Sequence, residues 1–287
     1  MTLDASGPNA EQIKYWNETA GPKWVALQQF IDEQIRPLGL LAMDKAKIAA
    51  GQQVLDIGCG CGDTTLEIAR RVGAGGSVTG IDISTAMLEQ ARQAARAAKL
   101  DNVSVENADA QTAKLPPSRY DLLFSRFGVM FFIDAAAAFA NLRKSLKPSG
   151  RLAFVCWRGV QDNPWMFVPV MAAAQHIVMP PPPAPGAPGP FSFAETERVS
   201  SILTKAGFAD VSFAEVNETL TIGGKVKLEQ TVEFLLQMGP TATIVRDSAD
   251  SVRKNVAAAV LEAIRPYSTP EGVRMASGAW IVTARNQ

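Results

Sequence analysis

Three glycines in five positions directly follow a short apolar segment, in the run Val54-Leu55-Asp56-Ile57-Gly58-Cys59-Gly60-Cys61-Gly62-Asp63-Thr64. The apolar residues predict a buried strand, and the residues after Gly62 predict a helix. Glycines at such a junction let the backbone turn sharply and let a ligand approach bare amide groups at the helix N-terminus. We therefore expect this loop to hold a ligand.

The spacing of these glycines differs from that of a dinucleotide-binding loop. The G-x-G-x-x-G pattern would need glycine at position 63 or 65, which are Asp63 and Thr65. An acidic residue beside the loop also disfavours a pyrophosphate. S-adenosylmethionine (SAM) carries no phosphate and has an amino-acid group and a sulfonium. The loop therefore favours SAM, with an NAD(P)-dependent oxidoreductase as the alternative.

A second acidic residue, Asp82, ends the next predicted strand, residues 77–83. A carboxylate at that place can accept hydrogen bonds from both ribose hydroxyls. Dinucleotide-binding enzymes keep an acid at a similar distance from their loop. Asp82 therefore predicts a ligand that contains adenosine, but it does not distinguish between SAM and NAD as that ligand.

Strands and helices alternate around these residues, which predicts a mostly parallel sheet with helices on both faces. The predicted strands are residues 54–57, 77–83, 103–105, 120–125, 151–157, 211–216 and 280–284. The helices between them are residues 64–72, 85–99, 135–146 and 195–206, and residues 147–150 form a turn.

Segments outside this alternation are expected to be helical. They are residues 10–50, with Pro37 breaking the helix, residues 163–179, with Pro169 as a kink, and residues 227–237 and 248–264, with Ser248 as N-cap. Pro180–Pro190 must be extended. We expect a helical cap segment at 1–45 and a main domain at 46–287, with cap insertions at about 159–194 and 223–270. Because open parallel sheets bind ligands at the carboxyl ends of their strands, these caps should determine the substrate.

Composition excludes several classes of protein. The 28 basic residues balance the 28 acidic ones without a basic cluster, so nucleic acid is not an expected partner. Cys59, Cys61 and Cys156 are too few for a disulfide framework, and Cys59 and Cys61 lack the further ligands of a zinc site. The first residues lack the basic and apolar regions expected of a signal peptide, and no apolar run reaches the roughly 18–20 residues that span a bilayer. We expect a cytoplasmic protein without a metal or a stable membrane insertion.

Five motifs in order over residues 50–157 resemble those of class I SAM-dependent methyltransferases, in the broad group that includes the ubiquinone and menaquinone methyltransferases. They are residues 54–62, 80–84, 107–110, 120–123 and 146–152. Tyr15-Trp16-Asn17 and Lys23-Trp24 resemble the group as well. The resemblance implies a Rossmann-like, doubly wound, seven-stranded, mostly parallel sheet with helical cap insertions, and SAM as cofactor.

The resemblance also assigns a set of cofactor-binding residues. They are Trp24, Asp56, Gly58, Gly60, Thr64, Asp82, Ile83, Met87, Asp109, Ala110 and Ser125. Asp56 and Gly58 would face the methionine part of SAM, with Gly60 and Gly62 lining its backbone side. Asp82 would bind the ribose, and Ile83 would pack on the adenine. Asp109 would bind the adenine amino group beside Ala110, and Ser125 and Arg126 would lie near the methionine carboxylate and the methyl group.

The methyl acceptor is less constrained. The segment after the fourth strand, Ser125 to Phe132, lacks the Asn/Asp-Pro-Pro-Tyr motif of methylases that act on DNA bases and amide nitrogens. A small molecule is therefore expected, and a cap over an apolar pocket would favour an aromatic, quinone-like or lipid-like one. The choice between O-, C- and N-methylation and the oligomeric state stay open. A non-catalytic SAM-binding protein is a further alternative.

Methyl transfer needs a general base only when the acceptor must lose a proton, so the lack of an obvious catalytic triad is no objection. Arg126 can bind a substrate anion or pair with a nearby acid. His176, the single histidine, can act as a base or be an ordinary helix residue. An aromatic and methionine cluster can line an apolar pocket or belong to the core. Its members are Phe127, Met130, Phe131, Phe132 and Trp157.

Overall fold

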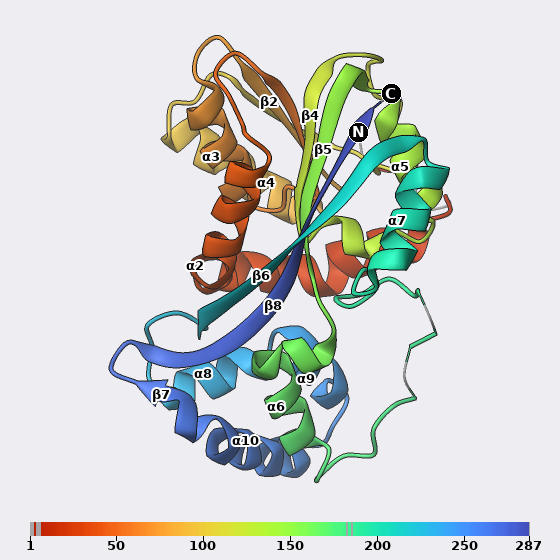
Figure 1. Cartoon of the computed structure of the whole chain (residues 1–287). Helices are drawn as coiled ribbons and strands as arrows, with labels where there is room; N and C mark the ends of the chain where they lie inside the picture. Colours follow the sequence, from red (N-terminus) through yellow and green to blue (C-terminus); the bar gives the residue numbers. More distant parts are fainter. Residues whose placement is uncertain (1–2, 4–6, 182, 185, 287) are drawn as a thin grey trace.

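A central sheet carries the fold in a computed structural model, which describes residues 3, 7–181, 183–184 and 186–286 (Figure 1). Its strands follow the order β3-β2-β1-β4-β5-β8-β6, and the two-residue β7 pairs with β8 as an eighth strand. The predicted mostly parallel α/β sheet is confirmed, and the seven strands of the main path are the seven predicted. The strands are β1 (Gln53–Ile57), β2 (Ser77–Asp82), β3 (Val103–Asn107), β4 (Tyr120–Arg126), β5 (Leu146–Trp157), β6 (Phe208–Ile222), β7 (Ser268–Thr269) and β8 (Gly272–Asn286).

Strands β1 to β5 are parallel, and β8 lies antiparallel between β5 and β6. The chain moves outward from β1 through β2 to β3 and then returns to β4 on the other side of β1. The crevice beside such a reversal, at the carboxyl ends of the strands, is where open α/β sheets bind ligands. The glycine loop follows β1 and therefore lies at this point.

Helices cover both faces of the sheet (Figure 1). α5 and α7 pack against each other on one face, and α3, α4 and α2 lie on the other. Their bounds are α2 (Gly21–Lys45), α3 (Asp63–Val72), α4 (Thr85–Ala97), α5 (Ala135–Arg143) and α7 (Thr196–Lys205). The core between these layers is apolar, and large side chains such as Phe124, Phe139 and Phe154 are fully buried there.

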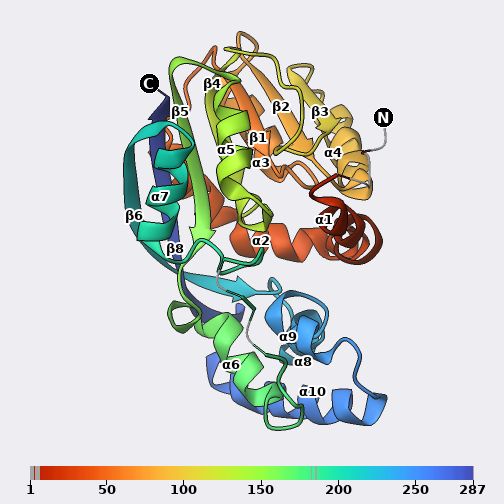
Figure 2. The same ribbon diagram turned by 90° about the vertical axis from the view of Figure 1, so that its right-hand side faces the viewer.

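The N-terminal helix is longer than predicted. It runs from α1 (Ala10–Lys14) through a π-helical segment, η1 (Tyr15–Ala20), into α2. The predicted break at Pro37 is wrong, because α2 continues through Pro37 to Lys45. Burial of one face on both sides of the proline outweighs the lost hydrogen bond. The face consists of Ile31, Ile35, Leu38 and Ala42. Figure 2 shows α2 running past the lower ends of the strands.

Strands β6 and β8 form a two-stranded ribbon that extends beyond the rest of the sheet (Figure 1). Phe208 pairs with Asn286 at one end of the ribbon, and Ile222 pairs with Val273 at the other. Four helices gather around its far end, and we call them the helical layer. They are α6 (Pro164–Ala173), α8 (Leu228–Leu235), α9 (Gly239–Val245) and α10 (Asp250–Ile264). α10 packs along α6, and α9 also contacts α6. Short 3-10 turns are η2 (Val129–Phe131), η3 (Val160–Asp162) and η4 (Arg265–Tyr267).

Several predicted boundaries need correction. α6 ends at Ala173 and not near residue 179, so His176 lies in the turn beyond it. α10 begins at Asp250 with Ala249 at the N-cap position, which replaces the predicted Ser248. The predicted turn at residues 147–150 belongs to β5, where the register with β4 shifts and the extra residues form a bulge.

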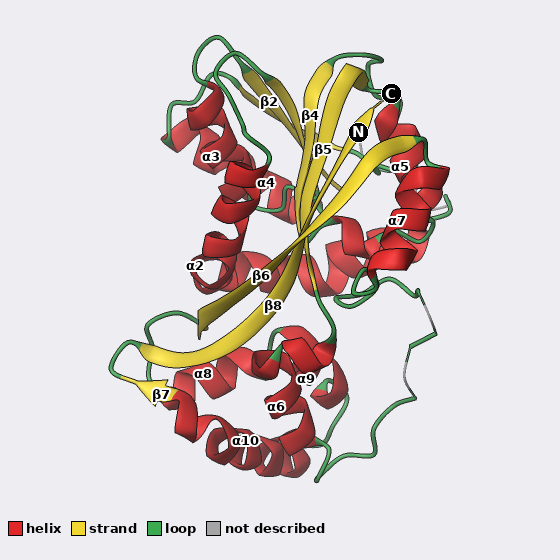
Figure 3. Ribbon diagram, viewed as in Figure 1, coloured by secondary structure: helices red, strands yellow, loops and turns green. Residues whose placement is uncertain are grey.

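The Pro180–Pro190 segment links the helical layer to α7 as a long loop (Figure 3). Residues 182 and 185 lie outside the described residues, and the others carry neither helix nor strand, as predicted. The segment is not extended throughout, because the Ala187 N–H donates to the Ala184 carbonyl at 2.9 Å in a turn. Its end returns to the sheet domain, where the Gly189 N–H donates to the carbonyl of Met130 at 3.0 Å. Within the described part of the chain, no helix is long and apolar enough to cross a membrane.

Candidate cofactor and substrate site

The glycine loop turns between β1 and α3 in a conformation that side chains disfavour. Gly58 and Gly60 have φ angles of +65° and +57°. A Cβ on Gly58 would lie 2.8 Å from the Cα of Gly128, and one on Gly60 would lie 3.0 Å from the Cε of Met87. The sequence pattern therefore reflects a close approach of two loops at the carboxyl ends of β1 and β4.

Asp56 lies at the base of this loop and is fully buried. Its Oδ2 accepts hydrogen bonds from the hydroxyls of Thr64 at 2.7 Å and Thr65 at 2.6 Å. Its Oδ1 is buried and has no hydrogen-bond partner among the described residues. Burial raises the pKa of this carboxyl to about 6, although the two threonines lower it. A buried acceptor without a partner is costly, so this oxygen fits a ligand that brings a hydrogen-bond donor, such as the ammonium group of SAM.

Asp82 ties the end of β2 to the glycine loop. Its Oδ2 accepts from the Gly60 N–H at 2.9 Å, and its Oδ1 accepts from the Ser84 N–H at 2.8 Å. Burial raises the pKa of Asp82, and these backbone donors oppose the rise. Each carboxylate oxygen has a second lone pair, so the side chain can still accept from ribose hydroxyls.

Asp109, in the loop after β3, is held from three directions. Its Oδ1 accepts from the Gln111 N–H at 2.9 Å, and its Oδ2 accepts from Thr112 Oγ1 at 3.1 Å and from Asn9 Nδ2 at 2.7 Å. The buried oxygens Asn9 Oδ1 and Gln12 Oε1 have no partner within the described ranges. Asn9 thus brings an amide group of the N-terminal segment to the place where the adenine is expected. The sequence did not indicate Asn9 or Gln12.

The π-helical segment η1 anchors the N-terminal helix to the loop after β2. Asn17 donates to the carbonyl of Ile83 at 2.9 Å and accepts from the Thr85 N–H at 3.0 Å. Trp16, its neighbour, contacts Phe131 and Trp24 edge to face, with ring centroids 5.1 and 5.9 Å apart. π-helical turns are frequent at functional sites. In the sequence these residues stood out only through the resemblance of the Tyr15-Trp16-Asn17 motif, which predicted no particular contact.

Arg126, which ends β4, pairs with two carboxylates. Its Nη1 lies 2.7 Å from Asp63 Oδ2, and its Nη2 lies 2.7 Å from Asp32 Oδ1. Arg36 also binds Asp63. Burial raises the pKa of Asp32, and Arg126 opposes that rise. Of the two alternatives expected for Arg126, the structure shows the pairing with acids. The network joins α2 to α3 and β4.

The remaining predicted residues have varied surroundings. Ser125 is fully buried, donates to the Ile57 carbonyl at 2.8 Å and accepts from the Gly128 N–H at 3.2 Å, so it holds β4 against β1. Met87 and Ala110 are buried and Trp24 and Ile83 are half-buried around the loops already described. His176 is exposed in the turn after α6.

Aromatic side chains continue from the carboxyl ends of β4 and β5 toward the helical layer. Phe127 stacks on Trp157, with centroids 4.1 Å apart and planes 15° apart. Trp157 meets Trp165 of α6 edge to face at 5.4 Å. Phe127, Met130 and Trp157 of the predicted cluster are buried, whereas Phe131 and Phe132 are half-buried.

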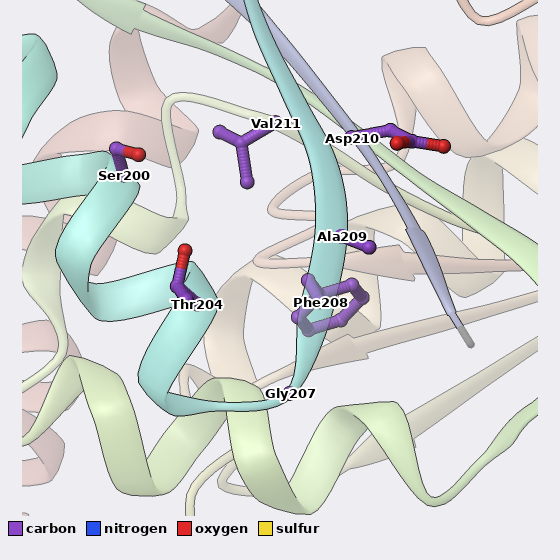
Figure 4. Close-up of a pocket in the computed structure, with 7 residues that line it drawn as sticks. All are labelled: Ser200, Thr204, Gly207, Phe208, Ala209, Asp210 and Val211. Carbon is purple, nitrogen blue, oxygen red and sulfur yellow. The ribbon is translucent and has the colours of Figure 1, made fainter.

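A surface hollow of about 430 Å³ lies elsewhere, between α7 and the start of β6 (Figure 4). Phe208, which lines the hollow, lies opposite Asn286 in the register of β6 and β8. The preceding residue of β8, Arg285, lies opposite Arg151 of β5, on the side of the sheet where β5 begins. The hollow therefore lies at the amino end of the parallel strands, away from the glycine loop.

Comparison with known proteins gives the family. Residues 54–150 match the model of a methyltransferase domain. The chain is 38% identical to aklanonic acid methyltransferase DauC of Streptomyces sp. strain C5 over 122 residues, 42% of this chain and 56% of that protein. It is 30% identical to demethylmenaquinone methyltransferase of Staphylococcus aureus strain MRSA252 over 173 residues, 60% of this chain and 70% of that protein. The chain belongs to the class I SAM-dependent methyltransferases.

The fold of this methyltransferase agrees with that family. Phosphoethanolamine N-methyltransferase 2 of Haemonchus contortus, in complex with SAM, superposes with a TM-score of 0.52 at 19% identity, over 88% of this chain and 53% of that one. The resemblance inferred from the motifs is confirmed, with SAM as cofactor. The alternative of an NAD(P)-dependent oxidoreductase is wrong.

Proposed function

We propose that this methyltransferase transfers the methyl group of SAM to a small aromatic or quinone-like acceptor. The observation that carries the proposal is the buried stack of Phe127 on Trp157, which we call the aromatic wall, at the carboxyl ends of β4 and β5 and beside the glycine loop. Planar rings pack well against such a wall. Two relatives named for aklanonic acid and demethylmenaquinone support this class of acceptor.

The cofactor would be held by the acidic residues that surround the glycine loop. Asp56 would accept from the ammonium group through its free Oδ1, Asp82 would accept from the ribose hydroxyls, and Asp109 would accept from the adenine amino group. When bound, SAM supplies a methyl group on a sulfonium that is already a good leaving group. The chain then contributes position and the exclusion of water.

Exclusion of water would come from the N-terminal residues 1–45 and from the insertions at about 159–194 and 223–270, acting as caps on the main domain 46–287. α2 runs past the lower ends of the strands and the helical layer lies beyond it, which supports this division (Figure 2). His176 is exposed, so its place in the turn after α6 gives no support for a role as base.

We infer a cytoplasmic setting, which the cysteine content supports. Cys59, Cys61 and Cys156 are buried and free, and unpaired cysteines suit a protein of the reducing cytoplasm. The balanced charge argues against a nucleic-acid partner.

A methyl-transfer assay tests the proposal. The protein is incubated with SAM labelled in its methyl group and with a panel of phenols, hydroquinones, aromatic acids, amines and nucleic acids. Label should pass to an aromatic member of the panel, and Asp82→Ala should slow the transfer at SAM concentrations that do not saturate the variant. Transfer only to amines or nucleic acids would reject the acceptor class. Tight binding of S-adenosylhomocysteine without any transfer would favour the non-catalytic SAM-binding protein.

A further inference from the structure

The indole N–H of Trp165 is a buried hydrogen-bond donor. Trp165 is 7% exposed, and its Nε1 has no hydrogen-bond partner in the part of the chain that the structure describes. Buried tryptophan N–H groups usually find an acceptor, and leaving one unsatisfied costs free energy. The ring of Trp157, 5.4 Å away, is at most a weak acceptor compared with an oxygen atom.

The position of Trp165 is fixed by its neighbours. Asn163, immediately before α6, donates to the Gly278 carbonyl at 3.0 Å and accepts from the Gly278 N–H at 3.1 Å. This buried pair of bonds attaches the first turn of α6 to β8. The indole is therefore held against the aromatic wall by the backbone of the sheet and not by a flexible loop.

The aromatic wall itself contains a strained residue. Phe127 has a φ angle of +62°, in the left-handed region that bulky side chains avoid. Its N–H donates to the Val155 carbonyl at 3.0 Å, and its ring stacks on Trp157. Such strain persists only where the surroundings impose it, and it clusters at binding sites. Two independent features, the strained backbone of Phe127 and the unsatisfied donor of Trp165, thus lie in the two residues whose rings contact Trp157.

We propose that Trp165 Nε1–H donates a hydrogen bond to an oxygen atom of the methyl acceptor, while the Phe127 and Trp157 rings pack against the acceptor's aromatic plane. This inference rests on the proposed function and narrows it. It selects acceptors that carry a carbonyl or hydroxyl oxygen on a planar ring, and it makes Trp165 a residue of substrate specificity.

The test uses two planar probes with the same carbon skeleton, 2,3-dimethyl-1,4-naphthoquinone, which carries two carbonyl oxygens, and 2,3-dimethylnaphthalene, which carries none. Their binding to the full chain saturated with S-adenosylhomocysteine is measured by equilibrium dialysis. The wild-type protein should bind the quinone more tightly than the hydrocarbon. Trp165→Phe keeps an aromatic ring and removes the N–H, so it should weaken quinone binding about 3- to 10-fold and leave hydrocarbon binding within about twofold.

Trp280→Phe is the matched control, because the Trp280 N–H is satisfied by the Ala194 carbonyl at 3.0 Å. That variant should lower the unfolding temperature and keep the preference for the quinone. Both variants delete the same part of the indole, and only Trp280→Phe also leaves the Ala194 carbonyl without its donor. Equal weakening of the two probes, no weakening of either, or no preference for the quinone in the wild-type protein would overturn the proposal. The methyl-transfer assay reports separately on the proposed function.

Discussion

Asn9 donates a hydrogen bond of 2.7 Å to Asp109, which lies 100 residues further along the chain. Both side chains are buried, with 4% and 6% of their surface exposed. The bond therefore fastens the N-terminal segment over the loop that follows β3. Because the acceptor is a carboxylate, this bond is stronger than one between neutral groups.

Removing the Asn9 side chain should loosen the N-terminal segment. We expect Asn9→Ala to increase amide hydrogen exchange in α1 and η1 about tenfold or more, because one charge-assisted bond is worth roughly 1.5–3 kcal/mol. Exchange in α2 should change little, since ion pairs hold it. Thr112→Val is the control, because Thr112 donates to the same Asp109 oxygen from within the loop. Equal exchange in the two variants would contradict the fastening role of Asn9.

Asp82 should be required for cofactor affinity. Asp82→Ala removes the acceptor for the ribose hydroxyls and releases the Gly60 N–H that it holds at 2.9 Å. We expect S-adenosylhomocysteine to bind at least about tenfold more weakly by calorimetry, since each charged hydrogen bond contributes roughly 1.5–3 kcal/mol. Asp121→Ala serves as control, because that carboxylate binds Lys147 and the Gln53 N–H instead. An affinity within about twofold of the wild type would remove Asp82 from the site.

Asp56 predicts how cofactor affinity varies with pH. Its pKa is raised from 3.8 to about 6 by burial, and only the carboxylate form can neutralise an ammonium group. S-adenosylhomocysteine affinity should therefore rise about tenfold between pH 5 and pH 7 and depend little on pH immediately above that. In Asp56→Asn the affinity should be lower and nearly constant over this range. A wild-type affinity that falls as pH rises from 5 to 7 would exclude this role.

The same carboxyl group affects stability with the opposite sign. Between pH 4 and 6 the native protein holds a proton on Asp56 that the unfolded chain has lost, so the free energy of unfolding falls as pH rises through this range. The loss is about 3 kcal/mol and is complete above about pH 6. Urea unfolding of the ligand-free wild type and of Asp56→Asn at several pH values isolates this contribution of Asp56, because the variant has no carboxyl group to titrate at that position. The stability difference between them should shift in favour of the variant as pH rises.

The parts of the fold that local sequence determines were predictable. β1, α3 and β2 have strong local signals, and the glycine loop sits where its spacing placed it. The lengths of β6 and β8 were not predictable from local sequence, because both strands extend to 15 residues through their pairing with each other. Polar residues such as Asn217 and Glu218 give no strand signal on their own, and cross-strand packing overrides their propensity.

The residues of the site also divide into those that local sequence identifies and those that depend on distant contacts. Asp56 and Asp82 stand next to the glycine motif in sequence or at a known distance from it, so their type and position identified them. Asn9 and Asp32 act across 100 and 94 residues, and no local pattern records such contacts. Pro37 favoured a break that the buried face of α2 prevents.

The pairing of Arg126 with Asp32 predicts unequal effects of removing either partner. Arg126→Met leaves the Asp32 carboxylate without its cation, whereas Asp63 retains Arg36. We expect the free energy of unfolding to fall by about 2–4 kcal/mol, as when a mostly buried ion pair loses one member. Asp32→Asn should cost less than about 1 kcal/mol, because burial already raises the pKa of Asp32 and so disfavours its charge.

The double variant then decides between two roles for Arg126. If Arg126 serves to neutralise Asp32, adding Asp32→Asn to Arg126→Met should recover about half of the lost free energy of unfolding. Chemical denaturation of the single and double variants gives this recovery as a coupling energy. Losses that simply add would contradict the pairing. If Arg126 also binds an anionic acceptor, the double variant should regain stability while its KM for that acceptor stays raised. A KM restored together with stability would show that Arg126 acts only by holding α2 against α3 and β4.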